Sequence, residues 1–156
     1  MALGQREKIT VYGDDWPTAD GTCIRDYIHV DDLGAAHLLA LERIESGKGL
    51  KVNLGTGNGY SVRQIVETCR EVTNCDIPEV MGPRRAGDPS ELVANATMAR
   101  SVLGWEPKYH MPKPIIETAW DWHRAHPNGY ATSTTDVAAE ISGEGEERSG
   151  QKKAAG

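Results

Sequence analysis

Residues 16–33 read WPTADGTCIRDYIHVDDL, and the interpretation of the remaining chain starts from this stretch. Its Trp-Pro and Asp-Gly pairs are typical of turns, so the stretch begins as a loop. Tyr27 to Val30 then forms a β-prone run, and Asp31 and Asp32 stand where a helix N-cap belongs. The stretch therefore predicts a loop that leads through a strand into a helix, with the two aspartates as caps.

Strand-like and helix-like segments alternate on both sides of this stretch, which predicts an α/β fold. The predicted strands are residues 9–12, 27–30 and 50–54. The first predicted helix runs from Leu33 to about Ile44, with Gly47 placed to stop it, and a second begins at a capping box formed by Ser61 and Gln64. A third runs from a cap at Asn95 to Gly104, and a fourth from Pro112 or Pro114 to a stop before Pro127.

Composition and charge limit the class of protein. The chain has 156 residues and a net charge of −6, which argues against nucleic acid or a membrane surface as partner because both are anionic. Three cysteines without C-x-x-C spacing fit neither a disulfide framework nor a zinc site, so we expect reduced thiols in a cytoplasmic protein. The start MALGQREKIT lacks an apolar h-region, and the apolar stretch Ala35–Leu41 is too short to span a bilayer.

The last 26 residues differ from the rest of the chain. Residues 131–156 are small and polar, and Val137 and Ile141 are their only sizeable apolar side chains. Such a segment cannot bury enough apolar area to offset its ordering entropy. We therefore predict one folded domain over residues 1–130 and a disordered polar tail over residues 131–156.

Two segments carry arginines that suit an anionic ligand. Arg25 lies at a loop–strand junction beside Asp26, and residues 82–95 (GPRRAGDPSELVAN) place Arg84 and Arg85 in an irregular turn before Asp88. Arginine forks bind phosphate oxygens in pairs, so one arginine from each segment could hold a diphosphate, and Asp88 suits a hydroxyl donor such as a ribose. A surface Arg25–Asp26 pair and a solvated Arg-Arg turn are the alternatives.

Other motifs argue against chemistry of their own. His29, between two β-branched residues, fits a buried hydrogen-bonded histidine better than a catalytic base. Residues 54–59 (LGTGNG) half-match a dinucleotide-binding fingerprint, but Tyr60 replaces the required third glycine, so a tight turn is the better interpretation. Spacing supports no metal site and no nucleophile motif, and we assign no catalytic residue.

The stretch DDWPTADGTCIRDYIHVDDLGAAHLLAL, residues 14–41, resembles the UDP-glucose 4-epimerase family of the extended short-chain dehydrogenase/reductase superfamily. NLGTGNGYSV, PRRAGDP, VLGWEPKY and TAWDWHRAHPNGY follow in the family's order, so the resemblance covers about residues 8–130. Complete members begin with a Rossmann domain that binds NAD and carries a catalytic Tyr and Lys four residues apart on one helix. Tyr109 and Lys113 match that spacing, but Pro112 and Pro114 are incompatible with a continuous helix there.

The resemblance therefore implies the C-terminal, substrate-binding part of a Rossmann-type enzyme that interconverts UDP-glucose and UDP-galactose. NAD would be bound by the missing N-terminal half, the complete enzyme would be a homodimer, and this chain would be inactive alone. It would also expose apolar surface that the missing half covers. The site positions that the resemblance implies are Thr10 and Tyr12 beside the uracil, Arg25 and Arg85 on the diphosphate, Asp88 on the ribose and Leu92 beside the sugar.

Leu92 matches a position that holds a larger tyrosine in some members of the family, so we expect N-acetylated sugars to be admitted at least in part. Two alternatives to the epimerase interpretation stay open. The chain could be a UDP-sugar-binding module without catalysis, or part of another nucleotide-sugar enzyme of the extended reductase family. The loop at residues 17–30 argues against the latter, because it is specific to hexose 4-epimerases.

Overall fold

The computed structural model describes residues 1–45 and 48–130, and it shows the mixed α/β architecture that the sequence predicts. The predicted tail, residues 131–156, and the predicted helix stop at Gly47 lie outside the described residues. The elements in chain order are β1 (Ile9–Tyr12), β2 (Ile24–Arg25), α1 (Val30–Arg43), β3 (Tyr60–Ser61), α2 (Val62–Thr73), β4 (Glu79–Gly82), β5 (Glu91–Leu92), α3 (Thr97–Leu103) and α4 (Pro112–Ala125).

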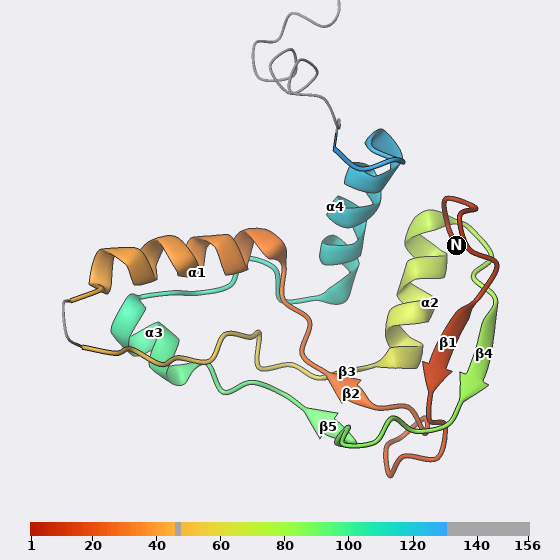
Figure 1. The fold of residues 1–156 in the computed structure, drawn as a ribbon, viewed down its shortest axis with the longest axis horizontal. Coiled ribbons are helices and arrows are strands. Elements are labelled where there is room, and N and C mark those ends of the chain that lie inside the picture. The colour runs from red at the N-terminus through yellow and green to blue at the C-terminus, as the bar shows by residue number, and fades with distance from the viewer. Residues whose placement is uncertain (46–47, 131–156) are drawn as a thin grey trace, which may run out of the picture.

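Two small sheets organise the chain. β1 and β4 pair in parallel, with Ile9 opposite Glu79 and Tyr12 opposite Gly82, and Figure 1 shows them side by side. β2 lies between β3, which is antiparallel to it, and β5, which is parallel to it. The predicted strand at residues 9–12 is therefore confirmed.

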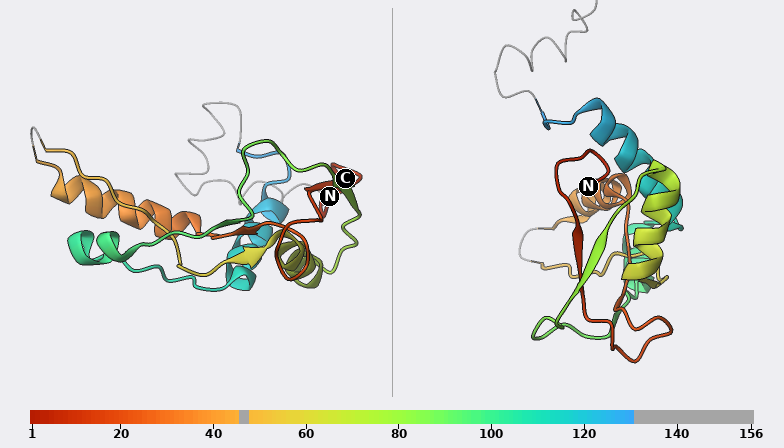
Figure 2. Two further views of the ribbon diagram at one scale, coloured as in Figure 1. Left: turned by 90° about the horizontal axis from the view of Figure 1, so that it is seen from below. Right: turned by 90° about the vertical axis from the view of Figure 1, so that its right-hand side faces the viewer.

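The helices form two groups, which we call the body, with α2 and α4, and the arm, with α1 and α3. α2 packs against α4 on the side of the molecule that holds β1 and β4, whereas α1 and α3 pack against each other at the other end (Figures 1 and 2). The buried cluster of the arm joins these two helices to the segment after α3, and it consists of Ala36, Ala96, Ala99, Leu103 and Trp105. The three-stranded sheet lies where arm and body meet.

The predicted strand at residues 27–30 is wrong. The strand in this region is β2, two residues earlier, and α1 already begins at Val30. His29 is the N-cap of α1, because its Nδ1 accepts a hydrogen bond from the backbone N–H of Asp31 at 2.9 Å. A β-prone composition does not make a strand here because pairing partners for β2 lie beside Ile24 and Arg25 instead.

The predicted strand at residues 50–54 is also wrong, although its alternation is visible in the burial pattern. Val52 and Leu54 are half-buried against the cluster of the arm, while Lys51 and Asn53 are exposed. Within the described residues, no strand pairs with this segment. The segment therefore has the side-chain pattern of a strand without the hydrogen-bonded ladder that defines one.

The predicted helix signals at α2, at the end of α3 and at the start of α4 act as expected, whereas the predicted Asn95 cap lies one residue before the N-cap of α3. Ser61 and Gln64 form a reciprocal capping box at α2, with the Gln64 N–H donating to Ser61 Oγ at 3.1 Å and the Ser61 N–H to Gln64 Oε1 at 2.8 Å. α3 ends at Gly104 in the left-handed region, and Pro112 occupies the first turn of α4. Asn95 accepts a hydrogen bond from the Thr97 N–H at 3.0 Å, although Ala96 is the N-cap residue.

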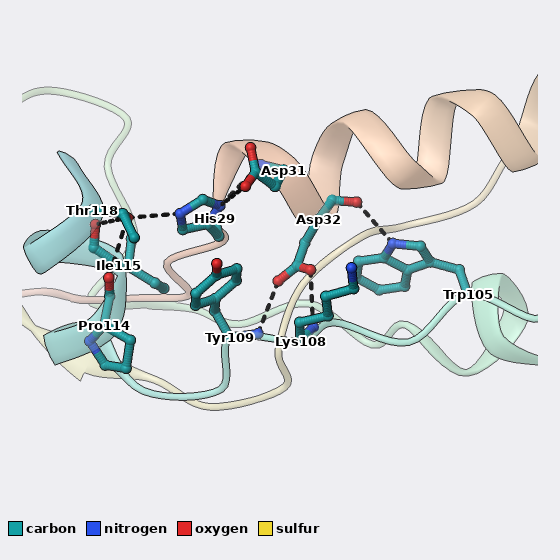
Figure 3. A network of polar contacts seen from close by, with 9 residues as sticks. All are labelled: His29, Asp31, Asp32, Trp105, Lys108, Tyr109, Pro114, Ile115 and Thr118. Atoms are coloured by element: carbon teal, nitrogen blue, oxygen red, sulfur yellow. Dashed lines mark hydrogen bonds and ion pairs between the residues drawn. The ribbon is translucent and has the colours of Figure 1, made fainter. Parts of the chain in front are cut away.

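Asp32 is not the helix cap that the sequence predicts. Its side chain lies inside the arm, 1% exposed, where the carboxylate accepts hydrogen bonds from the backbone N–H groups of Lys108 at 2.9 Å and Tyr109 at 3.0 Å (Figure 3). The backbone carbonyl oxygen of Asp32 accepts a further hydrogen bond, from Trp105 Nε1 at 2.8 Å. Asp32 thereby holds the start of α1 against the segment between α3 and α4.

His29 links the same region to α4, as Figure 3 shows. Its Nε2 lies 2.7 Å from Thr118 Oγ1, and its ring stacks on Tyr109 with ring centroids 3.9 Å apart. The prediction of a buried, hydrogen-bonded histidine is confirmed.

We predict that Asp32→Ala lowers the free energy of unfolding by about 3 kcal/mol, because two backbone N–H groups then lose a charged acceptor. Asp31→Ala is the matched control: Asp31 lies in the same helical turn but its side chain is exposed, so its loss should cost less than about 1 kcal/mol. Urea titration followed by circular dichroism measures both. Equal losses in the two variants would contradict the structural role assigned to Asp32.

Candidate functional site

The candidate site lies where β1 and β4 end. The two parallel strands end at Tyr12 and Gly82. The loop after β1 and the turn after β4 that carries Arg84 and Arg85 (the arginine turn) therefore leave the sheet at the same end. There the Arg85 guanidinium carbon lies 3.9 Å from the centroid of the Tyr12 ring. Tyr12 and Arg85, which the family resemblance assigns to one ligand, are thus in contact.

Arg25 approaches the same turn from β2. Its Nη2 lies 3.7 Å from an Asp88 carboxylate oxygen, and the Asp88 N–H donates to the carbonyl of Arg85 at 3.3 Å. Arg25, Arg85 and Asp88 therefore gather around one turn, although they come from segments more than fifty residues apart. The group contains two arginines and one carboxylate, of which only Arg25 pairs with Asp88, so it carries a positive charge that suits an anionic ligand.

Thr10 and Leu92 lie on strands at two sides of this group. Thr10 pairs with Val80 in the β1–β4 ladder, and within the described residues the other edge of β1 has no partner strand. Leu92 lies on β5 opposite Arg25, with 62% of its surface exposed. The structure thus offers an open strand edge near Tyr12 and an exposed apolar side chain near Arg25.

Arg84 is a structural residue of the site that the sequence interpretation missed. Its Nε donates to an Asp15 carboxylate oxygen at 2.6 Å, and its guanidinium carbon lies 4.2 Å from the centroid of a Trp16 ring. Arg84 therefore holds the arginine turn against the loop after β1, although both arginines are exposed, as the alternative of a solvated Arg-Arg turn also requires. Trp16 and Asp15 beside a turn were the only sequence signals for this contact.

Gly13 allows this approach between the two loops. Its φ is +84°, and a Cβ there would lie 2.5 Å from Trp16 Nε1 and 2.9 Å from Arg84 Cγ. Any side chain at this position would therefore both strain the backbone and push Trp16 and Arg84 apart.

The alternative of a surface Arg25–Asp26 pair is wrong. The Asp26 carboxylate accepts hydrogen bonds from the backbone N–H groups of Thr56 at 2.9 Å, Gly57 at 3.0 Å and Ala94 at 3.2 Å. A Cβ on Gly55 would lie 2.5 Å from Asp26 Oδ2, so glycine is needed for this approach. The tight-turn interpretation of residues 55–59 is supported, because amides that a dinucleotide phosphate would require are already bound to Asp26.

Asp20 holds the loop after β1 to the start of α2. Its carboxylate accepts hydrogen bonds from the N–H and hydroxyl of Thr22, at 2.9 and 2.7 Å, and from the hydroxyl of Ser61. Partial burial raises the pKa of this carboxyl, but the hydrogen bonds from Ser61 and Thr22 outweigh burial and hold the pKa below its ordinary value. The loop is thus fixed at one end by Asp20 and at the other by Arg84.

The tyrosine and lysine at catalytic spacing do not form a catalytic pair. Tyr109 precedes α4, with its N–H bound to Asp32 and its ring on His29, while Lys113 lies within the first turn of the helix. Burial raises the pKa of Tyr27 and of the Cys69 thiol, which favours their protonated forms. Cys23, Cys69 and Cys75 are free thiols.

Residues 1–45 and 48–130 contain no group of three or more His, Cys, Asp or Glu side chains placed to hold a metal ion. No helix in this part of the chain is long and apolar enough to cross a membrane.

Comparison with known proteins first defines the class. The family model described as the NAD dependent epimerase/dehydratase family matches residues 1–55. The match covers β1, the loop after it, β2 and α1, and it ends at Gly55, directly before the backbone amides of Thr56 and Gly57 that bind Asp26. The fold is therefore that of a part of a Rossmann-type enzyme of the extended short-chain dehydrogenase/reductase class, as predicted.

Individual relatives narrow this class. The UDP-glucose 4-epimerase of Halalkalibacterium halodurans is 50% identical over 137 residues, which are 87% of this chain and 41% of that protein. The enzyme of Streptomyces lividans is 56% identical over 130 residues, 83% of this chain and 39% of that protein. A crystal structure of the Bifidobacterium longum UDP-glucose 4-epimerase with NAD+ and UDP is 36% identical, with a TM-score of 0.77 over 83% of this chain and 38% of that one.

The predicted resemblance to the UDP-glucose 4-epimerases is thus confirmed, and the chain spans about two fifths of the length of the relatives it matches. The alternative of a different nucleotide-sugar enzyme finds no support among these three relatives.

We predict a pH-dependent contribution of Asp20 to stability. Because the folded-state pKa of this group is lowered, its contribution is present above the ordinary value of 3.8 and is lost as the pH falls through the folded-state pKa. The stability difference between the wild type and Asp20→Asn should therefore shrink as the pH falls below about 4. Urea titrations from pH 7 to pH 3 measure it, with Asp14→Asn, in the same loop but exposed, as the control.

A constant difference between the wild type and Asp20→Asn over this pH range would show that the hydrogen bonds of Asp20 do not depend on its charge.

Proposed function

We propose that this chain is the UDP-sugar-binding portion of a UDP-glucose 4-epimerase, which interconverts UDP-glucose and UDP-galactose together with an NAD-binding half. The observation that carries the proposal is the convergence of Tyr12, Arg25, Arg85 and Asp88 on one turn. Its composition suits a nucleoside diphosphate: an aromatic face for a base, two arginines for phosphates and a carboxylate for hydroxyls. The two relatives that are 50% and 56% identical are both UDP-glucose 4-epimerases, which supports this choice of enzyme.

The open edge of β1 would hold the uracil. Among the described residues β1 pairs only with β4, so the backbone groups of Thr10 and the N–H of Tyr12 on the other edge remain available to a base, whereas the Tyr12 carbonyl already accepts a hydrogen bond from Trp16 Nε1 at 3.4 Å. The Tyr12 ring is 38% exposed, which leaves part of it free for contact with the base. Arg85, which already stacks on this ring, would then lie next to the phosphates attached to the same nucleoside.

Arg25 and Arg85 would hold the diphosphate from two sides, and Asp88 would accept hydrogen bonds from the ribose. Arg25 is held in place because its Nη1 also donates to the carbonyl of Ile24 at 2.7 Å. The ion pair between Arg25 and Asp88 is long, 3.7 Å, so both groups can turn toward a ligand at small cost. The nucleotide would be bound firmly, whereas the sugar would meet only the exposed Leu92 on this chain.

This division suits an epimerase, because the sugar must present both faces while the nucleotide stays bound. NAD would supply hydride transfer, but the described residues do not fit a dinucleotide: the glycine turn at residues 55–59 is occupied by Asp26. We therefore assign NAD and the catalytic tyrosine and lysine to the other half of the protein, and we expect the isolated chain to be inactive.

We also propose a cytoplasmic protein, which three free thiols support, and a homodimer in the complete enzyme. Residues 1–130 would form the substrate-binding domain and residues 131–156 a separate polar tail, as their composition suggests. A UDP-sugar-binding module without catalysis is the second candidate function, because residues 1–45 and 48–130 place no Tyr–Lys pair at catalytic spacing on one helix.

The test is titration calorimetry of this chain with UDP, alone and with the part of the Streptomyces lividans relative that lies outside the match. We expect weak or no binding alone and tight binding with the added half. Arg85→Ala and Arg25→Ala should each raise the Kd about 10- to 100-fold, because each charge-assisted contact contributes on the order of 1.5–3 kcal/mol. Arg124→Ala removes an arginine that pairs with Asp121 on α4, and it should leave the Kd unchanged.

Unchanged UDP affinity in Arg85→Ala and Arg25→Ala would contradict the assigned site. Turnover of UDP-glucose by the isolated chain would contradict the assignment of the chemistry to the other half. Tight UDP binding without turnover in the reconstituted protein would favour the module without catalysis.

We expect Leu92 to admit N-acetylated sugars. In the reconstituted protein, Leu92→Tyr should lower kcat/KM for UDP-N-acetylglucosamine at least tenfold and that for UDP-glucose less than threefold, because a larger ring occupies space that the acetamido group needs. Steady-state assays with both substrates give the ratio. A wild-type protein that epimerises UDP-glucose but excludes UDP-N-acetylglucosamine would refute the role of Leu92.

A further inference from the structure

Tyr60, Arg25 and Leu92 form a row across the three-stranded sheet. In β2, Arg25 pairs with Tyr60 of β3 on one side and with Leu92 of β5 on the other (Figure 1). Side chains that lie directly opposite each other on neighbouring strands point to the same face of a sheet. Arg25 and Leu92 already belong to the proposed ligand site, so Tyr60 faces the side on which the ligand would lie.

The opposite face of the sheet is closely packed. A Cβ on Gly59 would lie 2.5 Å from Ile24 Cγ2 and 2.8 Å from Val93 Cγ2. Gly59, Ile24 and Val93 each stand next in sequence to a member of the row, and successive side chains of a strand point to opposite faces. These three residues therefore form one face of the sheet, and the row that contains Tyr60 forms the other.

The hydroxyl of Tyr60 has only a weak acceptor. It donates to Met111 Sδ at 3.2 Å, and within residues 1–45 and 48–130 this sulfur is its only hydrogen-bond partner. A thioether sulfur accepts hydrogen bonds weakly, whereas an ionised phosphate oxygen accepts them strongly. Met111 is 56% exposed and directly precedes α4. The hydroxyl can therefore exchange this sulfur for a stronger acceptor at small cost.

We propose that Tyr60 is a further substrate-binding residue, whose hydroxyl donates a hydrogen bond to the diphosphate of the UDP-sugar beside Arg25. The inference rests on the proposed function and deepens it, because it adds a neutral donor to the two arginines. Neighbouring strands lie about 4.8 Å apart, so the side chains of Tyr60 and Arg25 start close enough to contact one diphosphate group.

The order of the row decides which part of the ligand Tyr60 contacts. Arg25 stands between Tyr60 and Leu92, because β2 is the central strand of the sheet. Tyr60 is thus one strand away from the residue proposed for the diphosphate and two strands away from the residue proposed for the sugar. A structural role is the alternative: Tyr60 would only hold the start of α4 through Met111.

The experiment is titration calorimetry of this chain mixed with the unmatched part of the Streptomyces lividans relative, with UDP and with uridine as ligands. Tyr60→Phe should raise the Kd for UDP about tenfold, because the variant keeps the ring but removes a donor to a charged group. The Kd for uridine, which has no phosphate, should change less than threefold.

Met111→Leu separates the binding role from the structural one. Leucine has a similar volume without the sulfur, so this variant removes the same hydrogen bond and leaves the Tyr60 hydroxyl in place. We expect its Kd for UDP to stay within threefold of the wild-type value. Tyr130→Phe is the matched control, because it removes a phenol hydroxyl from an exposed residue outside the row, and it should also change the Kd less than threefold.

Equal UDP affinity of the wild type and Tyr60→Phe would overturn the inference. A loss of affinity in Met111→Leu as large as that in Tyr60→Phe would assign the effect to the start of α4, and an equal loss for UDP and uridine would exclude the phosphates. Either result would overturn the inference as well. Circular dichroism of each variant excludes a general loss of folding as the cause of weaker binding.

Arg25→Ala in the same titration separates this inference from the proposed function. If Arg25→Ala weakens UDP binding and Tyr60→Phe does not, the proposed function stands and the role of Tyr60 is wrong. If neither variant changes the Kd for UDP, the proposed ligand site itself is wrong, and the inference fails with it.

Discussion

The carboxylate of Asp26 is the contact on which the arrangement of this chain depends most. It accepts backbone N–H groups from Thr56, Gly57 and Ala94, which lie 30, 31 and 68 residues further along the chain. These bonds fix the end of β2 against two segments that lead into β3 and follow β5. Because β2 is only two residues long, its ladder alone is too short to hold the centre of the molecule.

The geometry of the candidate site depends on these hydrogen bonds of Asp26. Arg25 precedes Asp26 directly, so the bonds that fix Asp26 also fix the starting point of the Arg25 side chain. Asp20 and Arg84 then hold the loop between β1 and β2 at two points, one against α2 and one against the turn that carries Arg85. The side chains that meet the proposed ligand thus need little ordering on binding, which lowers its entropic cost.

Local signals in the sequence predicted the parts of the fold that depend on near neighbours. The capping box at Ser61, the helix stop at Gly104 and the strand at residues 9–12 all involve short-range patterns. Asp26 and Asp32 were not assigned correctly, because their partners lie 30 to 77 residues away and an aspartate before a helix reads as a cap. The prediction of a strand at residues 50–54 was wrong for a related reason. Its side-chain pattern is that of a strand, but a hydrogen-bonded ladder also needs a partner strand, and the described residues provide none.

Association of the two halves and binding at the proposed ligand site are coupled in physical terms. A UDP-sugar bound to Arg25 and Arg85 would place its sugar beyond the exposed Leu92, where this chain offers little contact. The other half would then complete the sugar's surroundings, so a ligand would contact both halves. Thermodynamic reciprocity requires that docking strengthen UDP-sugar binding by the same factor by which the ligand strengthens docking. The isolated chain would therefore bind a UDP-sugar more weakly than the complete protein does, even though its nucleotide contacts are formed in advance.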